Sequence, residues 1–329
     1  MDRRLEIVRP FLFAAGAAIA LVAANCSSVP EAGEADAGKA LDIRALRWID
    51  RDADKIAFLT ATPPACERPA SSQAERIQRI LGRIAFESPA LLGGAAARMG
   101  LSCSACHVNG RGNPEFFVES VSDKPGTADV TSSTFSKVRG DGTFNPVPIP
   151  DLAAKDGKQI KDRKSSEFRT KVHGLVVEEF DGQEPPPEVF EALLAYLDGL
   201  DLAACTLEER VPIDPARDVD FAKAAFDASN DAGLGADARI FYLRAARLRL
   251  ELIHERFFGA RDAKLRERLV TLSRGLGARA EIVRSMNPGD PPRPELFFSP
   301  GWSDLKLEVE KARPRSYYNP DVLRVALPE

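Results

Sequence analysis

One segment, Cys103-Ser104-Ala105-Cys106-His107, constrains this chain more than any other part of its sequence. The chain has 329 residues but only five cysteines and three histidines, so these scarce side chains are concentrated here. Side chains three positions apart lie on the same face of a helical turn, which brings the two thiols together. The segment therefore predicts thiol or metal chemistry at this place.

Two thiols at this spacing, followed directly by a histidine, are typical of covalent haem attachment. Each thiol can form a thioether with one of the two vinyl groups of a haem, and the adjacent imidazole then binds the iron from the proximal side. We therefore predict one covalent haem c, held by Cys103, Cys106 and His107.

The segment has three other interpretations. A thioredoxin-like redox pair needs a strand before it, whereas the Ala- and Gly-rich residues before Cys103 favour a helix. A disulfide between the two cysteines would leave His107 without a role. A zinc site would need further ligands. The candidates for those ligands are Cys66, Cys205, His173 and His254.

Residues 1–25 are typical of a secretory signal peptide. Three arginines precede an apolar run from Pro10 to Ala24, which is too short to span a bilayer as a helix. We therefore expect an exported protein, located in the periplasm.

Residues 23–26, Ala-Ala-Asn-Cys, resemble a bacterial lipoprotein signal, in which the cysteine becomes the lipidated N-terminus. Asn25 departs from that pattern, which has Gly, Ala or Ser before the cysteine. Cys26 is therefore either a lipid anchor to a membrane or an ordinary cysteine after cleavage. Residues 26–42 are small and acidic, as expected of a flexible tether.

The apolar residues of the remaining chain mostly follow a helical period, so we expect a mainly α fold. Residues 72–86 place isoleucines and a leucine on one face, with Arg and Glu opposite, and residues 186–200 begin with prolines at the first turn. The best strand signal is Ile56–Thr60, and residues 108–166 predict a long loop. Further helices are expected at residues 217–229, 236–258 and 261–274.

The segment Leu81–Phe86, followed by Gly100–His107, resembles the bacterial di-haem cytochrome c peroxidases and the related methylamine-pathway oxidases. Those proteins carry a similar Gly-x-x-Leu-Phe stretch before a Ser-Cys-Ala-x-Cys-His site, and Phe168-Arg169-Thr170 is a weaker similarity. The resemblance implies a cytochrome c-like haem domain, here residues 43–206, followed by a helical domain of unknown role at 211–329. The family has two haem sites and this chain has one, so a two-haem mechanism within one chain is not implied.

The sixth iron ligand decides the chemistry, because a His or Met there closes the iron and an open position admits peroxide or oxygen. We predict His173, which lies in the same domain and before its last helix. Met99, His254 and Met286 are more typical of core or surface residues. An open position is the remaining alternative.

These features predict an exported mono-haem cytochrome that transfers single electrons to or from a redox partner protein. The alternative is a haem peroxidase or oxidase with an open iron, in which Glu178 and Glu179 serve as acid–base groups. A third option is a haem that acts as a sensor or a structural cross-link. The net charge of −4 argues against nucleic-acid binding, membrane contact would come only through Cys26, and the oligomeric state is not predicted.

Two further patterns lie outside the haem segment. Cys66 and Cys205 bracket the predicted haem domain, and an exported protein can join them in a disulfide, with two buried free thiols as the alternative. The charged stretches 244–249 and 261–268 predict solvated helix faces, or else a surface on which a redox partner docks.

Overall fold

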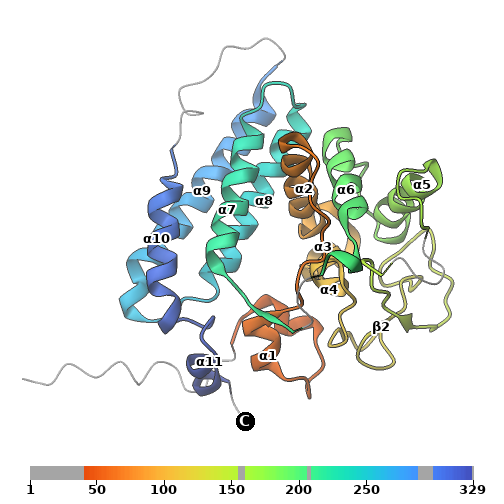
Figure 1. Cartoon of the computed structure of the whole chain (residues 1–329), viewed down its shortest axis with the longest axis horizontal. Coiled ribbons are helices and arrows are strands. Elements are labelled where there is room, and N and C mark those ends of the chain that lie inside the picture. Colours follow the sequence, from red (N-terminus) through yellow and green to blue (C-terminus); the bar gives the residue numbers. More distant parts are fainter. Residues whose placement is uncertain (1–40, 155–159, 206–208, 288–298, 328–329) are drawn as a thin grey trace, which may run out of the picture. The chain divides into compact units, whose positions relative to one another are not determined.

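The computed structural model describes residues 41–154, 160–205, 209–287 and 299–327, and in these residues the chain is mainly helical (Figure 1). The predicted signal peptide, Cys26 and nearly all of the predicted tether lie outside the described residues. No helix in the described part of the chain combines the length and the apolar character needed to cross a membrane. The helices are α1 (Lys55–Thr60), α2 (Gln73–Phe86), α3 (Gly94–Met99), α4 (Cys103–Cys106), α5 (Ser166–Gly174), α6 (Pro187–Gly199), α7 (Pro215–Ser229), α8 (Ala236–His254), α9 (Ala263–Ser285), α10 (Trp302–Ala312) and α11 (Pro320–Ala326).

Within the described residues, four two-residue strands form two small antiparallel pairs. Strand β1 (Ala61–Thr62) pairs with β4 (Val211–Pro212), and β2 (Thr127–Ala128) pairs with β3 (Val147–Pro148). Residues 108–154 otherwise form loops with one short 3-10 turn, as the weak periodicity of this region predicted.

The predicted helices at 72–86, 186–200, 217–229 and 236–258 are confirmed as α2, α6, α7 and α8. The helix predicted at 261–274 continues to Ser285 as α9, because Leu276, Ala280 and Val283 extend its buried face beyond two glycines. The strand predicted at Ile56–Thr60 is wrong, since these residues form α1. The Asp54 side chain accepts a hydrogen bond from the Ala57 amide, and this N-cap favours the helix over a strand.

Helices α2 and α6 cross at Gly82. A Cβ atom at this position would lie 1.8 Å from the backbone oxygen of Ala192, so the two backbones approach as closely as glycine permits. This crossing lies one residue before Arg83, which faces the haem segment described below.

Replacing Gly82 by Ala should therefore lower the free energy of unfolding by about 1–3 kcal/mol, as expected for overpacking. The matched control is Gly277→Ala in α9, where the added methyl meets only the flexible end of the Arg247 side chain. That variant should be neutral or slightly stabilising. Urea unfolding of both variants measures the difference, and equal stability of the two would contradict the crossing.

Cys66 and Cys205 form a disulfide, as the sequence favoured, with their Cα atoms 4.5 Å apart and a sequence separation of 139 residues. The bridge joins the segment before α2 to the segment after α6. Arg111 donates hydrogen bonds from Nη1 to both sulfurs, at 3.2 and 3.5 Å, so the loop after the haem segment lies against this bridge.

Removing the bridge with Cys66→Ser and Cys205→Ser should lower the free energy of unfolding by roughly 4–5 kcal/mol in the chain-entropy model. Reductant should destabilise the wild-type protein and leave the double variant unchanged. Peptide mapping by mass spectrometry identifies the linked pair, and finding both thiols free in unreduced protein would refute the bridge.

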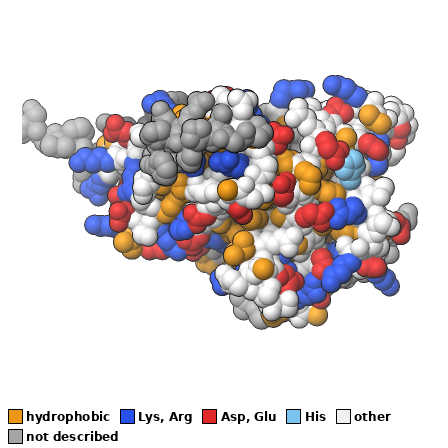
Figure 2. All heavy atoms as spheres, turned by 90° about the horizontal axis from the view of Figure 1, so that it is seen from above, with side chains coloured by type: hydrophobic (Ala, Val, Ile, Leu, Met, Phe, Trp, Pro, Cys, Tyr) orange, Lys and Arg blue, Asp and Glu red, His pale blue; other side chains and the backbone are white. Residues whose placement is uncertain are grey.

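The largest core cluster includes residues from both segments that the sequence assigned to separate domains. Phe86, Tyr196 and Leu193 come from the first segment, and Phe221 and Leu243 come from the second. Helix α2 contacts α7, and α6 contacts α8. The independent folding of residues 43–206 and 211–329 stays a prediction. On the described part of the face shown in Figure 2, basic and acidic side chains are interspersed.

Candidate functional site

The two cysteines of the predicted haem segment form the ends of the one-turn helix α4, and both thiols are free. Helix α3 before it ends at Gly100, whose φ of 76° reverses the chain direction. The helix predicted before the cysteines is thereby confirmed, in place of the strand that a thioredoxin-like pair requires. The two thiols pack against an apolar cluster that contains Trp48, Leu101, Ala105, Phe116 and Phe135.

Burial raises the pKa of the Cys103 thiol to about 12, and it raises the pKa of Cys106 as well. Redox-active cysteine pairs have thiol pKa values below the ordinary one, in electropositive surroundings. The apolar setting of these two thiols is the opposite of that arrangement.

His107 caps the C-terminal end of α4, and its ring is held by a distant part of the chain. Its Nδ1 lies 3.0 Å from the backbone oxygen of Pro150. A carbonyl only accepts, so Nδ1 carries the proton and Nε2 keeps its lone pair. Burial lowers the pKa of His107 to about 4, against the smaller opposite effect of the Pro150 contact, so the ring is neutral at pH 7. A neutral imidazole oriented through its other nitrogen is what a metal-ligating histidine requires.

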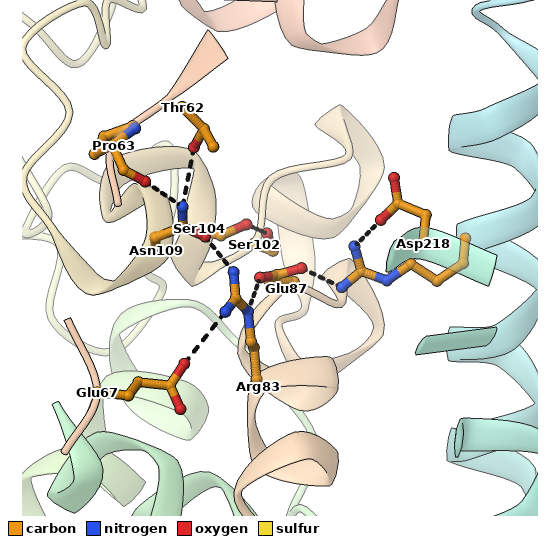
Figure 3. A network of polar contacts seen from close by, with 10 residues as sticks. Thr62, Pro63, Glu67, Arg83, Glu87, Ser102, Ser104, Asn109 and Asp218 are labelled. Atoms are coloured by element: carbon orange, nitrogen blue, oxygen red, sulfur yellow. Dashed lines mark hydrogen bonds and ion pairs between the residues drawn. The ribbon is translucent and has the colours of Figure 1, made fainter. Parts of the chain in front are cut away.

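The turn after His107 is built on two residues in the left-handed region, Asn109 (φ 54°) and Gly110 (φ 77°). The Asn109 amide donates to Thr62 Oγ1 at 3.0 Å and to the Pro63 oxygen at 2.5 Å, and its side-chain oxygen accepts from Arg83 (Figure 3). Asn tolerates this backbone conformation and has both a donor and an acceptor. Asn109 thus fixes the turn after His107 to α2 and to the segment at β1.

Arg83 is the first member of a buried ionic network (Figure 3). Its Nε donates to Glu87 at 2.8 Å and its Nη1 to Glu67 at 3.2 Å. Glu87 also pairs with Arg249 of α8, whose other nitrogen lies 3.2 Å from Asp218 of α7. The network therefore connects the turn after His107, through α2, to two helices of the C-terminal segment.

The burial of these arginines differs from the solvent exposure that the sequence pattern predicted. We expected the arginines of residues 72–86 to lie on the solvent face, but Arg79 and Arg83 are buried. Arg249, in the stretch expected to be solvated, is buried as well. The guanidinium groups of Arg83, Arg217 and Arg249 all lie within 6 Å of the Phe221 ring, at 5.4, 5.7 and 5.2 Å. Cation–π contact contributes to the stability of cations removed from water.

Glu87 makes the network sensitive to pH. Burial alone would raise its pKa, but the ion pairs with Arg249 and Arg83 lower the pKa to about 2. A carboxyl group whose pKa is lowered in the folded state stabilises the protein above its unfolded pKa, near pH 4.5, and loses that contribution as the pH falls towards 2.

The variant Glu87→Gln should lower the free energy of unfolding by about 3–5 kcal/mol at pH 7, because it leaves two buried guanidiniums without their shared partner. The difference from wild type should shrink as the pH falls from 5 to 2. The control Glu281→Gln removes an exposed ion pair of α9 and should cost less than about 1 kcal/mol. A difference between wild type and Glu87→Gln that is constant across this pH range would contradict the assignment.

The structure places His173 on α5, apart from the contacts just described. Its Nε2 lies 2.7 Å from Glu184 Oε2, its ring meets the edge of Phe190, and 37% of its side chain is exposed. Iron ligation through Nε2 would require Glu184 to give up this contact, so the role of His173 stays a prediction. Of the other candidates, Met99 packs on the apolar cluster of the two cysteines, His254 ends α8, and Met286 follows α9.

The two carboxylates of the alternative function lie on a π-helical turn, Leu175–Glu179. Glu178 is exposed and pairs with Arg139 at 2.9 Å, and Glu179 pairs with the same guanidinium at 3.0 Å but is buried. Burial raises the pKa of Glu179 to about 6, against the opposing effect of Arg139. The next residue, Phe180, packs on the cluster that holds Cys103 and Cys106.

Several contacts around the segment could not be found from sequence patterns. Pro150 and Arg249 belong to no motif, and Arg83 lies within the Leu81–Phe86 stretch without any pattern that predicts its contact with Asn109. Within the described residues, no group of three or more His, Cys, Asp and Glu side chains is arranged to hold a metal ion.

Comparisons with known proteins identify no relative of this chain. No family model, no curated protein and no solved structure matches this chain. The resemblance to the di-haem peroxidases therefore rests on the haem segment and the residues before it.

Proposed function

We propose that this protein is an exported mono-haem c-type cytochrome that transfers single electrons. Cys103 and Cys106 would hold the haem covalently, and His107 would be the proximal iron ligand. When bound, such a haem supplies an iron that gains or loses one electron. The cytochrome c-like arrangement of residues 43–206 and the periplasmic location belong to this proposal.

The proposal rests on two free thiols, Cys103 and Cys106, and on the oriented imidazole of His107 at the end of the same helix. Both thiols are free and lie against apolar side chains, as thioether formation with a haem requires. The contact between His107 Nδ1 and the Pro150 oxygen leaves Nε2 available to iron and fixes the orientation of the ring. The residues present therefore fit a covalent haem.

The proposed sixth ligand is His173. Helix α5 carries it within residues 43–206, the predicted domain that also contains His107. With His107 on one side of the iron, the imidazole of His173 on the other side would close the iron centre. Its partner Glu184 would then be free to bond other groups.

One observation favours the alternative of a peroxidase or oxidase with an open iron. Glu179 is buried, carries a pKa of about 6 and stands next to Phe180 of the cysteine-bearing cluster. A general acid or base works best when its pKa lies near the operating pH. Glu179 would then move protons for a bound peroxide, with Arg139 holding the carboxylate in place.

Expression with haem-attachment machinery in an exporting host tests these proposals. We expect haem that stays on the chain after denaturation, a low-spin ferric spectrum, and loss of covalent haem in Cys103→Ala with Cys106→Ala. His173→Ala should convert the spectrum to high spin, whereas the control His254→Ala should leave it unchanged.

Two outcomes would contradict the electron-carrier proposal. A high-spin wild type that responds to peroxide, is unaltered by His173→Ala and loses its response in Glu179→Gln would establish the alternative. A wild type without covalent haem, expressed with working attachment machinery, would refute both functions.

A further inference from the structure

A groove of about 340 Å³ that includes Gly100, three residues before Cys103, is lined by four arginines. They come from three elements: Arg44 and Arg47 from a 3-10 helix (Arg44–Trp48), Arg98 from α3, and Arg244 from α8. Among the described residues that line the groove there is no Asp or Glu. The rest of the lining is Ser88, Pro89, Ala90, Ala97, Gly100 and Leu248.

The charges of this groove are poorly compensated. Arg98 and Arg244 are exposed and have no ion pair among the described residues. Arg47 pairs with Asp42 at 2.8 Å, but both side chains are mostly exposed, and Arg44 lies 3.7 Å from Glu251. The exposed pair of Arg47 contributes little, and the Arg44 side chain is half-buried, so Arg98, Arg244 and Arg47 are the guanidiniums most available to an anionic surface.

The groove lies near Cys103–His107 in the sequence, and one of its elements packs on the same apolar cluster as the two cysteines. Arg98 and Gly100 stand just before Cys103, and the Arg44 side chain lies against Gly100, where a Cβ atom would be 3.0 Å from Arg44 Cδ. Trp48, at the end of the same 3-10 helix as Arg44 and Arg47, packs in the cluster on which both cysteines lie. A protein seated on the groove would therefore be near the predicted haem.

We propose that this arginine groove is the docking site for the acidic face of a redox partner protein. The inference rests on the proposed function, and it names the surface and the charge of the partner. Complexes that transfer electrons have small interfaces and are steered together by complementary charge. A local cluster of four arginines can provide that steering although the whole chain has a net charge of −4.

The test measures how fast reduced flavodoxin, an acidic protein that donates single electrons, reduces the haem-loaded protein. One electron leaves flavodoxin and one is gained by this protein. Arg98→Glu with Arg244→Glu should slow the reaction about tenfold at low ionic strength, and high salt should abolish the difference. The neutral pair Arg98→Gln with Arg244→Gln should fall in between.

The matched control is Lys264→Glu with Arg274→Glu, which makes the same charge change at exposed positions of α9 outside the groove lining. Its rate should stay within twofold of wild type. Equal slowing by both double variants would show that net charge, not the groove, controls the rate, and would overturn the proposal.

A second measurement does not depend on haem. Calorimetry with hexacyanocobaltate(III), a redox-inert trianion, should detect binding to the wild type that Arg98→Glu with Arg244→Glu abolishes. If the trianion binds but the flavodoxin rates do not differ, the groove takes small anions only and the docking proposal fails. A chain that carries no covalent haem defeats the proposed function, whereas absence of trianion binding defeats this inference alone.

Discussion

The contact between Arg83 and Asn109 is the interaction on which the arrangement around the haem segment depends. It joins a buried guanidinium of α2 to the turn that follows His107. Because Arg83 also binds Glu67 and Glu87, and Glu87 binds Arg249, the position of that turn is coupled to α7 and α8. Glu87 is the carboxylate that Arg83 and Arg249 share, so its removal leaves both buried guanidiniums with less compensating charge, which is strongly destabilising in the interior.

The helices were predictable because apolar residues at helical spacing and good first-turn residues are local signals. Residues 72–86 and 186–200 became α2 and α6 with shifts of about one residue. The same local reasoning was wrong for Ile56–Thr60, where a capping aspartate outweighs strand-like composition, and it ended α9 too early at two glycines. The first error overlooked a local capping signal, and the second came from judging α9 without the face against which it packs.

The candidate site was predictable only in part, and for a related reason. Cys103, Cys106 and His107 form a contiguous motif, so sequence spacing identifies them. The contacts of Pro150 with His107 and of Arg83 with Asn109 are made only by the fold. Periodicity assigned Arg83 to solvent because it lies opposite the isoleucines of its helix, yet α2 packs against α6 and also against α7, so this side of the helix is buried too.

The backbone conformation of Asn109 also limits which amino acids can occupy this position. A residue at φ 54° must be Gly, Asn or Asp to avoid strain, and of these only Asn both donates to Pro63 and accepts from an arginine. The recognisable signature is therefore longer than the pentapeptide: it extends from Cys103 to Asn109 and includes an arginine 26 residues upstream of Asn109. Sequences that share this combination are expected to fold the turn after the histidine in the same way, even where overall identity is too low to align.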